Sequence, residues 1–305
     1  MILRPLAFGL VAFSTFSNAA NSAPVLGGLE LWLDSGIGVE AAPGDAAKAG
    51  DLVSRWLDQS GNNRHFSQAS SSNRPVFQDD SVNGSAALSF NGENQWLQGP
   101  SIPSLGSSSL TIFAVLTGED STSEQDQEQA IFADVGWSGA VLQRSTYVDG
   151  TLTFYSNWTP GNVPSASVST APGSLPNSGF SASIVSAIKD LNTLATVSVD
   201  SLFDATDTSG VVLLPYTGGT TYIGAHFEPL GAGATSDYTG YHGSIAELLV
   251  YSTALNESDF AATNHYLQEK YGLTAIPEPT VWSLMLAGFA IFGFRQLRVR
   301  APSPN

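Results

Sequence analysis

The 305-residue sequence contains no cysteine. This absence excludes disulfide bonds, thiolate metal sites and cysteine nucleophiles together. It says little about the compartment, because many large exported domains fold without disulfides. Charged residues are also scarce, at 12% of the chain. Long amphipathic helices depend on Glu, Lys and Leu, so the composition disfavours a helical fold.

Basic residues are few and lie mainly outside the acidic part of the chain. All 27 acidic residues lie between Glu30 and Glu278, together with only seven bases, which gives this part a net charge of −20. The other four bases are Arg4, Arg295, Arg298 and Arg300. A negative field repels nucleic-acid phosphates and anionic lipid. We therefore expect no nucleic-acid partner, whereas neutral sugars and cations such as calcium are compatible with this charge.

Residues 1–20 have the features of a signal peptide. Arg4 precedes an apolar stretch from Leu6 to Phe16, which is too short to span a bilayer, and small residues follow at Ala19 and Ala20. This order of a charged, an apolar and a small-residue region is typical of a cleaved export signal. The alternative is a buried first strand.

The other end of the chain contains a second apolar segment, residues 281–294. A helix of this length spans about 21 Å, whereas the hydrocarbon core of a membrane is about 30 Å thick. The segment can cross only if Trp282 lies at one interface and the arginines extend to the other. The sequence therefore predicts a short transmembrane helix with its basic tail in the cytoplasm.

The order of motifs around this segment is specific. Pro277, Glu278 and Pro279 precede the apolar helix, and Arg295, Arg298 and Arg300 follow it. This arrangement resembles the PEP-CTERM sorting signal of Gram-negative bacteria that produce exopolysaccharide. The resemblance implies a sorting signal over residues 275–300 and an exosortase-type peptidase as a partner. It also implies attachment first to the inner membrane, then a place at the cell surface or in the extracellular matrix. The alternative is an ordinary membrane anchor.

Between the two ends, short β-branched and aromatic runs alternate with turn residues such as Ser60-Gly61-Asn62 and Asn83-Gly84. Many short strands at this spacing predict an all-β sandwich or barrel. The predicted strands are 29–33, 52–57, 86–90, 110–116, 130–135, 152–155, 183–188, 194–199, 221–223 and 245–251.

A single helix is predicted from Glu257 to Tyr271. Asn256 is a suitable N-cap and Gly272 a suitable stop. Phe260, Leu267 and Tyr271 fall on one face, which we expect to cover one end of the sandwich.

Several motifs of this region carry a second resemblance. They are Leu29–Asp34, Trp56–Asn62, Arg74-Pro75, Ala87–Gly92 and Gly243–Tyr251. The region is similar to the laminin-G-like branch of the concanavalin A-type lectin and glucanase domains. The resemblance implies an antiparallel jelly-roll β-sandwich over residues 24–274, often with ligand or calcium binding. Fold alone does not give function.

Glu124, Asp126 and Glu128 have the spacing of the catalytic strand in the glucanases of that fold. Alternation along a strand would place the three carboxylates on one face, as a glycosidase requires. However, Gln125 and Gln127 replace the apolar residues between them. We interpret the segment as a solvated acidic loop and predict no catalytic residue. A glycan hydrolase that uses Glu124 and Glu128 is the alternative.

Two further sets of side chains are candidates for binding. Asp58 and Asn62, with Asp34, could supply oxygen ligands to calcium, although a turn explains the 58–62 segment on its own. Trp137, Trp158 and Tyr147 lie among Gly, Ser and Asn and could form a platform for a sugar.

The sequence thus favours an exported, non-catalytic carbohydrate-binding protein associated with exopolysaccharide. It requires no cofactor, and calcium is possible. The alternatives are the hydrolase and a structural matrix protein without a specific ligand.

Overall fold

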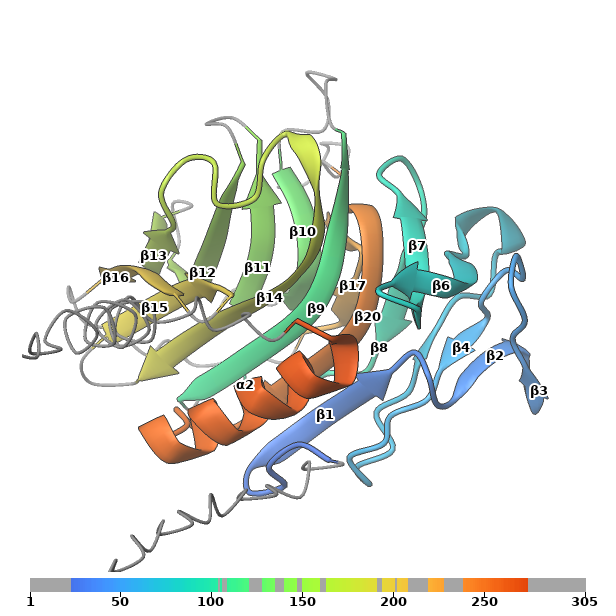
Figure 1. Cartoon of the computed structure of the whole chain (residues 1–305), viewed down its shortest axis with the longest axis horizontal. Helices are drawn as coiled ribbons and strands as arrows, with labels where there is room; N and C mark the ends of the chain where they lie inside the picture. The colour runs from blue at the N-terminus through green and yellow to red at the C-terminus, as the bar shows by residue number, and fades with distance from the viewer. Residues whose placement is uncertain are drawn as a thin grey trace, which may run out of the picture.

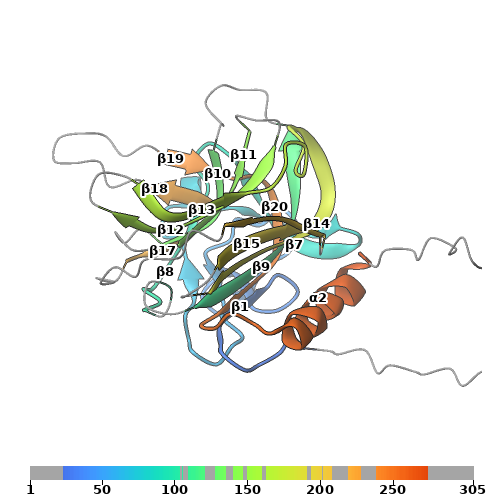
Figure 2. The same cartoon turned by 90° about the vertical axis from the view of Figure 1, so that its left-hand side faces the viewer.

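A computed structural model describes residues 23–103, 105, 109–120, 128–134, 140–146, 150–159, 163–190, 194–200, 202–207, 219–227 and 238–273. These residues form two antiparallel β-sheets that pack face to face, with a C-terminal helix on the outside of one of them (Figures 1 and 2). The all-β sandwich and its C-terminal helix are therefore confirmed. The predicted signal peptide, transmembrane segment and sorting motif lie outside the described residues. No helix within the described residues is long and apolar enough to cross a membrane.

The first sheet has the order β16-β15-β14-β9-β20-β7-β6, and β1 pairs with β20. It therefore brings the first strand of the domain against the last, in antiparallel register from Asp34 with Glu247 to Leu29 with Tyr251. Its strands are β1 (Leu29–Asp34), β6 (Val76–Val82), β7 (Ser85–Asn91), β9 (Leu110–Asp120), β14 (Ser178–Asp190), β15 (Leu194–Val199), β16 (Leu202–Asp207) and β20 (His242–Tyr251).

The second sheet has the order β13-β12-β11-β10-β17-β8-β5-β4-β2-β3. Its strands are β2 (Val39–Ala42), β3 (Asp45–Ala46), β4 (Arg55–Trp56), β5 (Phe66–Ser67), β8 (Leu97–Gly99), β10 (Glu128–Asp134), β11 (Ala140–Ser145), β12 (Thr151–Thr159), β13 (Val163–Ser169) and β17 (Thr221–Ile223). A hairpin of β18 (Ala225–Phe227) and β19 (Tyr238–Gly240) and a short 3₁₀ helix, η1 (Ser71–Asn73), complete the described elements.

Strand β9 shows why the first sheet is apolar on both faces. Ile112 and Ala114 point between the sheets into the main core, whereas Phe113 and Val115 belong to a second cluster on the outer face. Successive side chains of a strand point to opposite faces. A strand that is buried on both sides therefore needs a continuous apolar run.

Helix α2 (Glu257–Tyr271) is what buries the outer face. The Asn256 side chain accepts a hydrogen bond from the backbone N–H of Asp259 at 2.9 Å, and Gly272 ends the helix in the left-handed conformation. Phe260, Leu267 and Tyr271 pack in the outer cluster, so the predicted apolar face is confirmed. The predicted position at one end of the sandwich is wrong, because the outward apolar side chains of β9 and β20 offer the helix a larger surface across the sheet (Figure 1).

A buried carboxylate, that of Glu247 on β20, fixes the helix to the sheet. Its Oε1 accepts hydrogen bonds from Trp32 Nε1 and the Tyr266 hydroxyl, both at 2.8 Å. Its Oε2 accepts from the Tyr271 hydroxyl at 2.8 Å and from Lys270 Nζ at 2.6 Å. Burial raises the pKa of Glu247, and the charge of Lys270 opposes this rise. The donors come from β1 and α2, so one side chain joins the beginning and the end of the domain.

We expect Glu247→Ala to lower the free energy of unfolding by about 3–5 kcal/mol, because it leaves the buried hydroxyls of Tyr266 and Tyr271 without their acceptor and removes one of the two carboxylate partners of Lys270. Chemical unfolding at neutral pH measures this loss. Glu40→Ala is the control, because Glu40 pairs with the partly exposed Arg55 at 3.0 Å and such pairs contribute about 0–1 kcal/mol. Equal losses in the two variants would contradict the role given to Glu247.

The buried imidazole of His226 on β18 predicts a loss of stability in mild acid. Burial lowers the pKa of His226 to about 4, from about 6.5 in the unfolded chain. As the pH falls from 6.5 towards 4, the unfolded state binds a proton that the folded state does not. Stability should therefore fall by an amount that approaches about 1.4 kcal/mol per pH unit.

Urea unfolding at pH 7, 6 and 5 tests this prediction. The slope of stability against pH should be smaller in His226→Gln than in the wild type, and unchanged in His265→Gln, because the His265 side chain is 45% exposed. An unchanged slope in His226→Gln would show that another group controls the acid response.

Candidate functional site: a polar hollow beside helix α2

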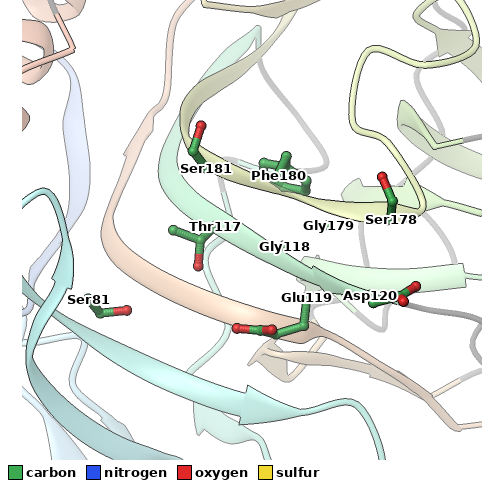
Figure 3. Close-up of a pocket in the computed structure, with 9 residues that line it drawn as sticks. All are labelled: Ser81, Thr117, Gly118, Glu119, Asp120, Ser178, Gly179, Phe180 and Ser181. Carbon is green, nitrogen blue, oxygen red and sulfur yellow. The ribbon is translucent and has the colours of Figure 1, made fainter.

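A polar hollow with a volume of ≈ 520 Å³ opens on the first sheet beyond the end of helix α2. Nine residues of β6, β9 and β14 and the adjoining turn line it (Figure 3): Ser81, Thr117, Gly118, Glu119, Asp120, Ser178, Gly179, Phe180 and Ser181. We call this feature the hydroxyl hollow.

The hydroxyl hollow lies where the outward positions of the sheet change from apolar to polar. Along β9, Phe113 and Val115 lie under the helix, and the next outward positions are Thr117 and Glu119. The end of the helix is fixed near β6, because Asn83 Nδ2 donates to the backbone oxygen of Tyr271 at 3.0 Å. The helix therefore covers the apolar part of the face and leaves the polar part open.

The side chains around the hollow point in defined directions. Thr117 and Glu119 point to the same side of β9, and Asp120 points away from them (Figure 3). This is the alternation expected of a strand. Within the described part of the chain, the hydroxyls of Ser81, Ser178 and Ser181 make no hydrogen bond, so they are available to a ligand.

A close contact between Gly118 and Phe180 forms the floor of the hollow. A Cβ at Gly118 would lie 2.1 Å from the Phe180 ring, so only glycine fits there. On the inner side of the sheet, the guanidinium carbon of Arg144 lies 5.2 Å from the centre of this ring. Strand β9 can therefore pair with β14 at this point only because position 118 lacks a side chain.

Arg144 is fully buried and holds the ends of the two strands in place. Its guanidinium donates to the backbone oxygens of Leu175 at 3.2 Å, Glu119 at 3.1 Å and Pro176, and to Gln129 Oε1 at 3.2 Å. Burial lowers the pKa of Arg144, and the nearby Asp120 carboxylate favours the charged form. The backbone of Glu119 is thus held from the inner side of the sheet.

The Asp58 carboxylate, which the sequence offered as a calcium ligand, is surrounded by donors of the protein. Its Oδ1 accepts from the backbone N–H groups of Trp32 at 3.0 Å and Ser60 at 2.9 Å. Its Oδ2 accepts from the Ser60 hydroxyl at 2.9 Å and the Arg64 N–H at 3.0 Å. Asn62 Nδ2 donates to the backbone oxygens of Leu29 and Glu30, both at 3.1 Å. These contacts fasten the 58–64 turn to β1.

Asp34 has a different set of partners. Its Oδ2 pairs with Lys270 Nζ at 2.6 Å, and its Oδ1 accepts from the Gly36 N–H at 2.9 Å. No group of three or more His, Asp or Glu side chains that could hold a metal occurs in the part of the chain that the structure describes. Calcium binding by Asp34, Asp58 and Asn62 stays a prediction.

The other predicted site residues are only partly within the described chain. Glu128 begins β10 and pairs with Ser145, whereas Glu124 and Asp126 lie outside the described residues. Trp158 lies in β12 opposite Pro164, and Trp137 and Tyr147 lie outside. The sequence-based interpretation missed Thr117, Glu119, Ser81 and Ser181. It ended the predicted strand at residue 116, although β9 continues to Asp120.

No protein-family model matches the chain, and no curated protein is similar to it in sequence. Solved structures with a similar fold include the receptor-binding domain of a botulinum neurotoxin C/D mosaic serotype. The two are 12% identical, the TM-score is 0.53, and the match covers 80% of this chain and 52% of that chain. A structure of botulinum neurotoxin type C, described for its interaction with two ganglioside molecules, gives 13% identity, a TM-score of 0.51 and coverages of 79% and 51%.

A sialidase of Trypanosoma rangeli gives 16% identity and a TM-score of 0.48, with 80% of this chain and 33% of that chain covered. The chain thus spans between a third and about half of the structures that it matches. At these identities the likeness concerns the β-sandwich fold alone.

We expect Asp58→Asn to lower the free energy of unfolding by about 1–3 kcal/mol, because an amide nitrogen would face buried N–H or O–H donors. Because the donors already occupy the carboxylate, added calcium should leave the melting temperature of the wild type unchanged. Thermal melting with calcium or with a chelator measures both effects, and Asp45→Asn on exposed β3 is the control. A rise of the wild-type melting temperature with calcium that is absent in Asp58→Asn would establish the metal site instead.

Proposed function

We propose that the chain is an exported, non-catalytic protein that binds glycan through the hydroxyl hollow. The observation that carries the proposal is an open depression on the sheet that presents the Glu119 carboxylate and three serine hydroxyls without a partner among the described residues. Hydroxyls donate and accept, and a carboxylate accepts at two oxygens. These are the groups that match the paired donor and acceptor character of sugar hydroxyls.

The placement of the carboxylates favours binding over hydrolysis. Glycosidases with two catalytic carboxylates hold them on either side of the bond that is cut, with about 5–9.5 Å between the two carboxyl groups. Glu119 and Asp120 follow each other on β9 and point in different directions (Figure 3). They therefore do not form such a pair.

The fold supports a lectin-like role, although the binding sites of the similar structures cannot be assigned to residues of this chain. One similar toxin structure is described for the dependence of cell entry on interaction with two ganglioside molecules, and another is a binding domain in complex with SialylT, at a TM-score of 0.50. These ligands belong to those proteins. For this chain, a sugar ligand is inferred from its own hollow.

The two ends of the sequence extend the proposal to location. The signal-like residues 1–20 would export the chain, and the apolar helix of residues 281–294 would hold it at the inner membrane. An exosortase-type peptidase would then act near Pro277–Pro279, and the domain would pass to the cell surface or the exopolysaccharide matrix of a Gram-negative bacterium.

Binding of the full-length chain to a panel of neutral, amine-bearing and acidic polysaccharides tests the proposal. At least one should bind saturably and raise the melting temperature, since a ligand that binds only the folded state stabilises it. The double variant Ser81→Ala, Ser181→Ala should bind on the order of tenfold more weakly, because each lost hydrogen bond contributes about 0.5–1.5 kcal/mol.

Ser71→Ala is the matched control, because Ser71 lies in the distant exposed η1 helix. Equal weakening in this control would place the binding site elsewhere. No saturable binding to any polysaccharide would leave a structural matrix protein without a specific ligand.

A further inference from the structure

The residues that line the hydroxyl hollow carry negative charge and no positive charge. Glu119 and Asp120 are both exposed at its edge, and none of the nine lining residues is Lys, Arg or His. Two more exposed carboxylates, Asp79 and Asp80, precede Ser81 on β6. A ligand that enters the hollow therefore meets a field of one sign.

The nearby cations do not neutralise this field. Arg144 lies behind the sheet, fully buried, and its donors are directed to three backbone carbonyls and Gln129. The groups that favour its charged form are Tyr241 and then Asp120. Lys270, on the adjacent helix, pairs with Asp34 and Glu247.

Glu119 remains as the uncompensated carboxylate on the hollow side of β9. Its side chain makes no hydrogen bond or ion pair within the described chain, whereas its backbone is held by Arg144. Figure 3 shows the side chain extending to the same side as Thr117, in the direction of Ser81. A carboxylate without a partner among the described residues, in a hollow that also presents serine hydroxyls, is suited to a group that donates several hydrogen bonds and carries positive charge.

We infer that the ligand of the hollow is a glycan with free amino groups, that is, one built from amino sugars without their N-acetyl groups. The inference rests on the proposed function and narrows it to one class of sugar. The ammonium group donates to Glu119, whose side chain extends in the direction of Ser81, and the serine hydroxyls of the hollow bind other groups of the same glycan (Figure 3). An N-acetyl group removes the charge, and a sialic acid places a carboxylate against Glu119.

The inference separates this chain from the structures that share its fold. One of the toxin structures is a binding domain in complex with SialylT, and sialylated ligands are anionic. The net charge of −20 between residues 30 and 278 opposes such ligands at long range and favours the approach of cationic ones.

Titration calorimetry with the full-length chain at low salt tests the inference. The probes are a glucosamine oligomer, its fully N-acetylated form of the same length, and sialyllactose. The amine form should bind on the order of tenfold more tightly than the acetylated form, the ratio expected of one charge-assisted hydrogen bond. Added salt should reduce this preference because it screens the charges.

Glu119→Gln should abolish the preference for the amine form, and Asp45→Asn should keep it. Both variants remove one negative charge, so general attraction of a cation by an acidic protein would lower both equally. The inference is overturned if the acetylated oligomer or sialyllactose binds as tightly as the amine form, or if Glu119→Gln keeps the preference. Those results would leave glycan binding intact, whereas failure to bind any glycan would also overturn the proposed function.

Discussion

The fold depends on one buried carboxylate. Glu247 has no exposed surface, and burying a charge without partners costs several kcal/mol. Four donors from β1 and α2 make its burial possible, and they can reach it only when the first strand, the last strand and the helix are all in place. The same contacts hold the helix over Phe113 and Val115 and determine where it ends. The uncovered polar part of the sheet, and with it the hydroxyl hollow, is a consequence of that position.

Local signals explain what could be predicted from the sequence. The helix bounds were predicted correctly because Asn256 and Gly272 act on the residues next to them. Each predicted strand overlaps a strand of the structure, although 52–57 is reduced to the two residues of β4. The missed strands are short, such as β3 and β5, or largely polar, such as β6 and β13. These strands form through backbone hydrogen bonds to a neighbouring strand, and their sequences show no alternation of apolar and polar residues that would predict them.

The candidate site could not be predicted in the same way. Glu247 could have been noticed as a charged residue within an otherwise apolar run, but the residues that donate to it lie up to 215 positions away. The hollow depends on how far helix α2 extends over the first sheet, and no pattern in the sequence near these residues predicts that extent. Glu119 lies beyond the predicted end of its strand at residue 116, although β9 continues to Asp120. In the structure Gly118 is required by the Phe180 ring of the neighbouring strand.

The contact between Gly118 and Phe180 also determines where the two carboxylates of β9 point. Arg144 holds the backbone oxygen of Glu119, and the register of β9 with β14 places Gly118 opposite Phe180. A shift by one residue would exchange the directions of Glu119 and Asp120, but it would also drive a side chain into the Phe180 ring. The register is therefore fixed by packing, and so is the separation of the two carboxylates. This separation of Glu119 and Asp120 on the sheet is the feature on which the proposed binding role depends.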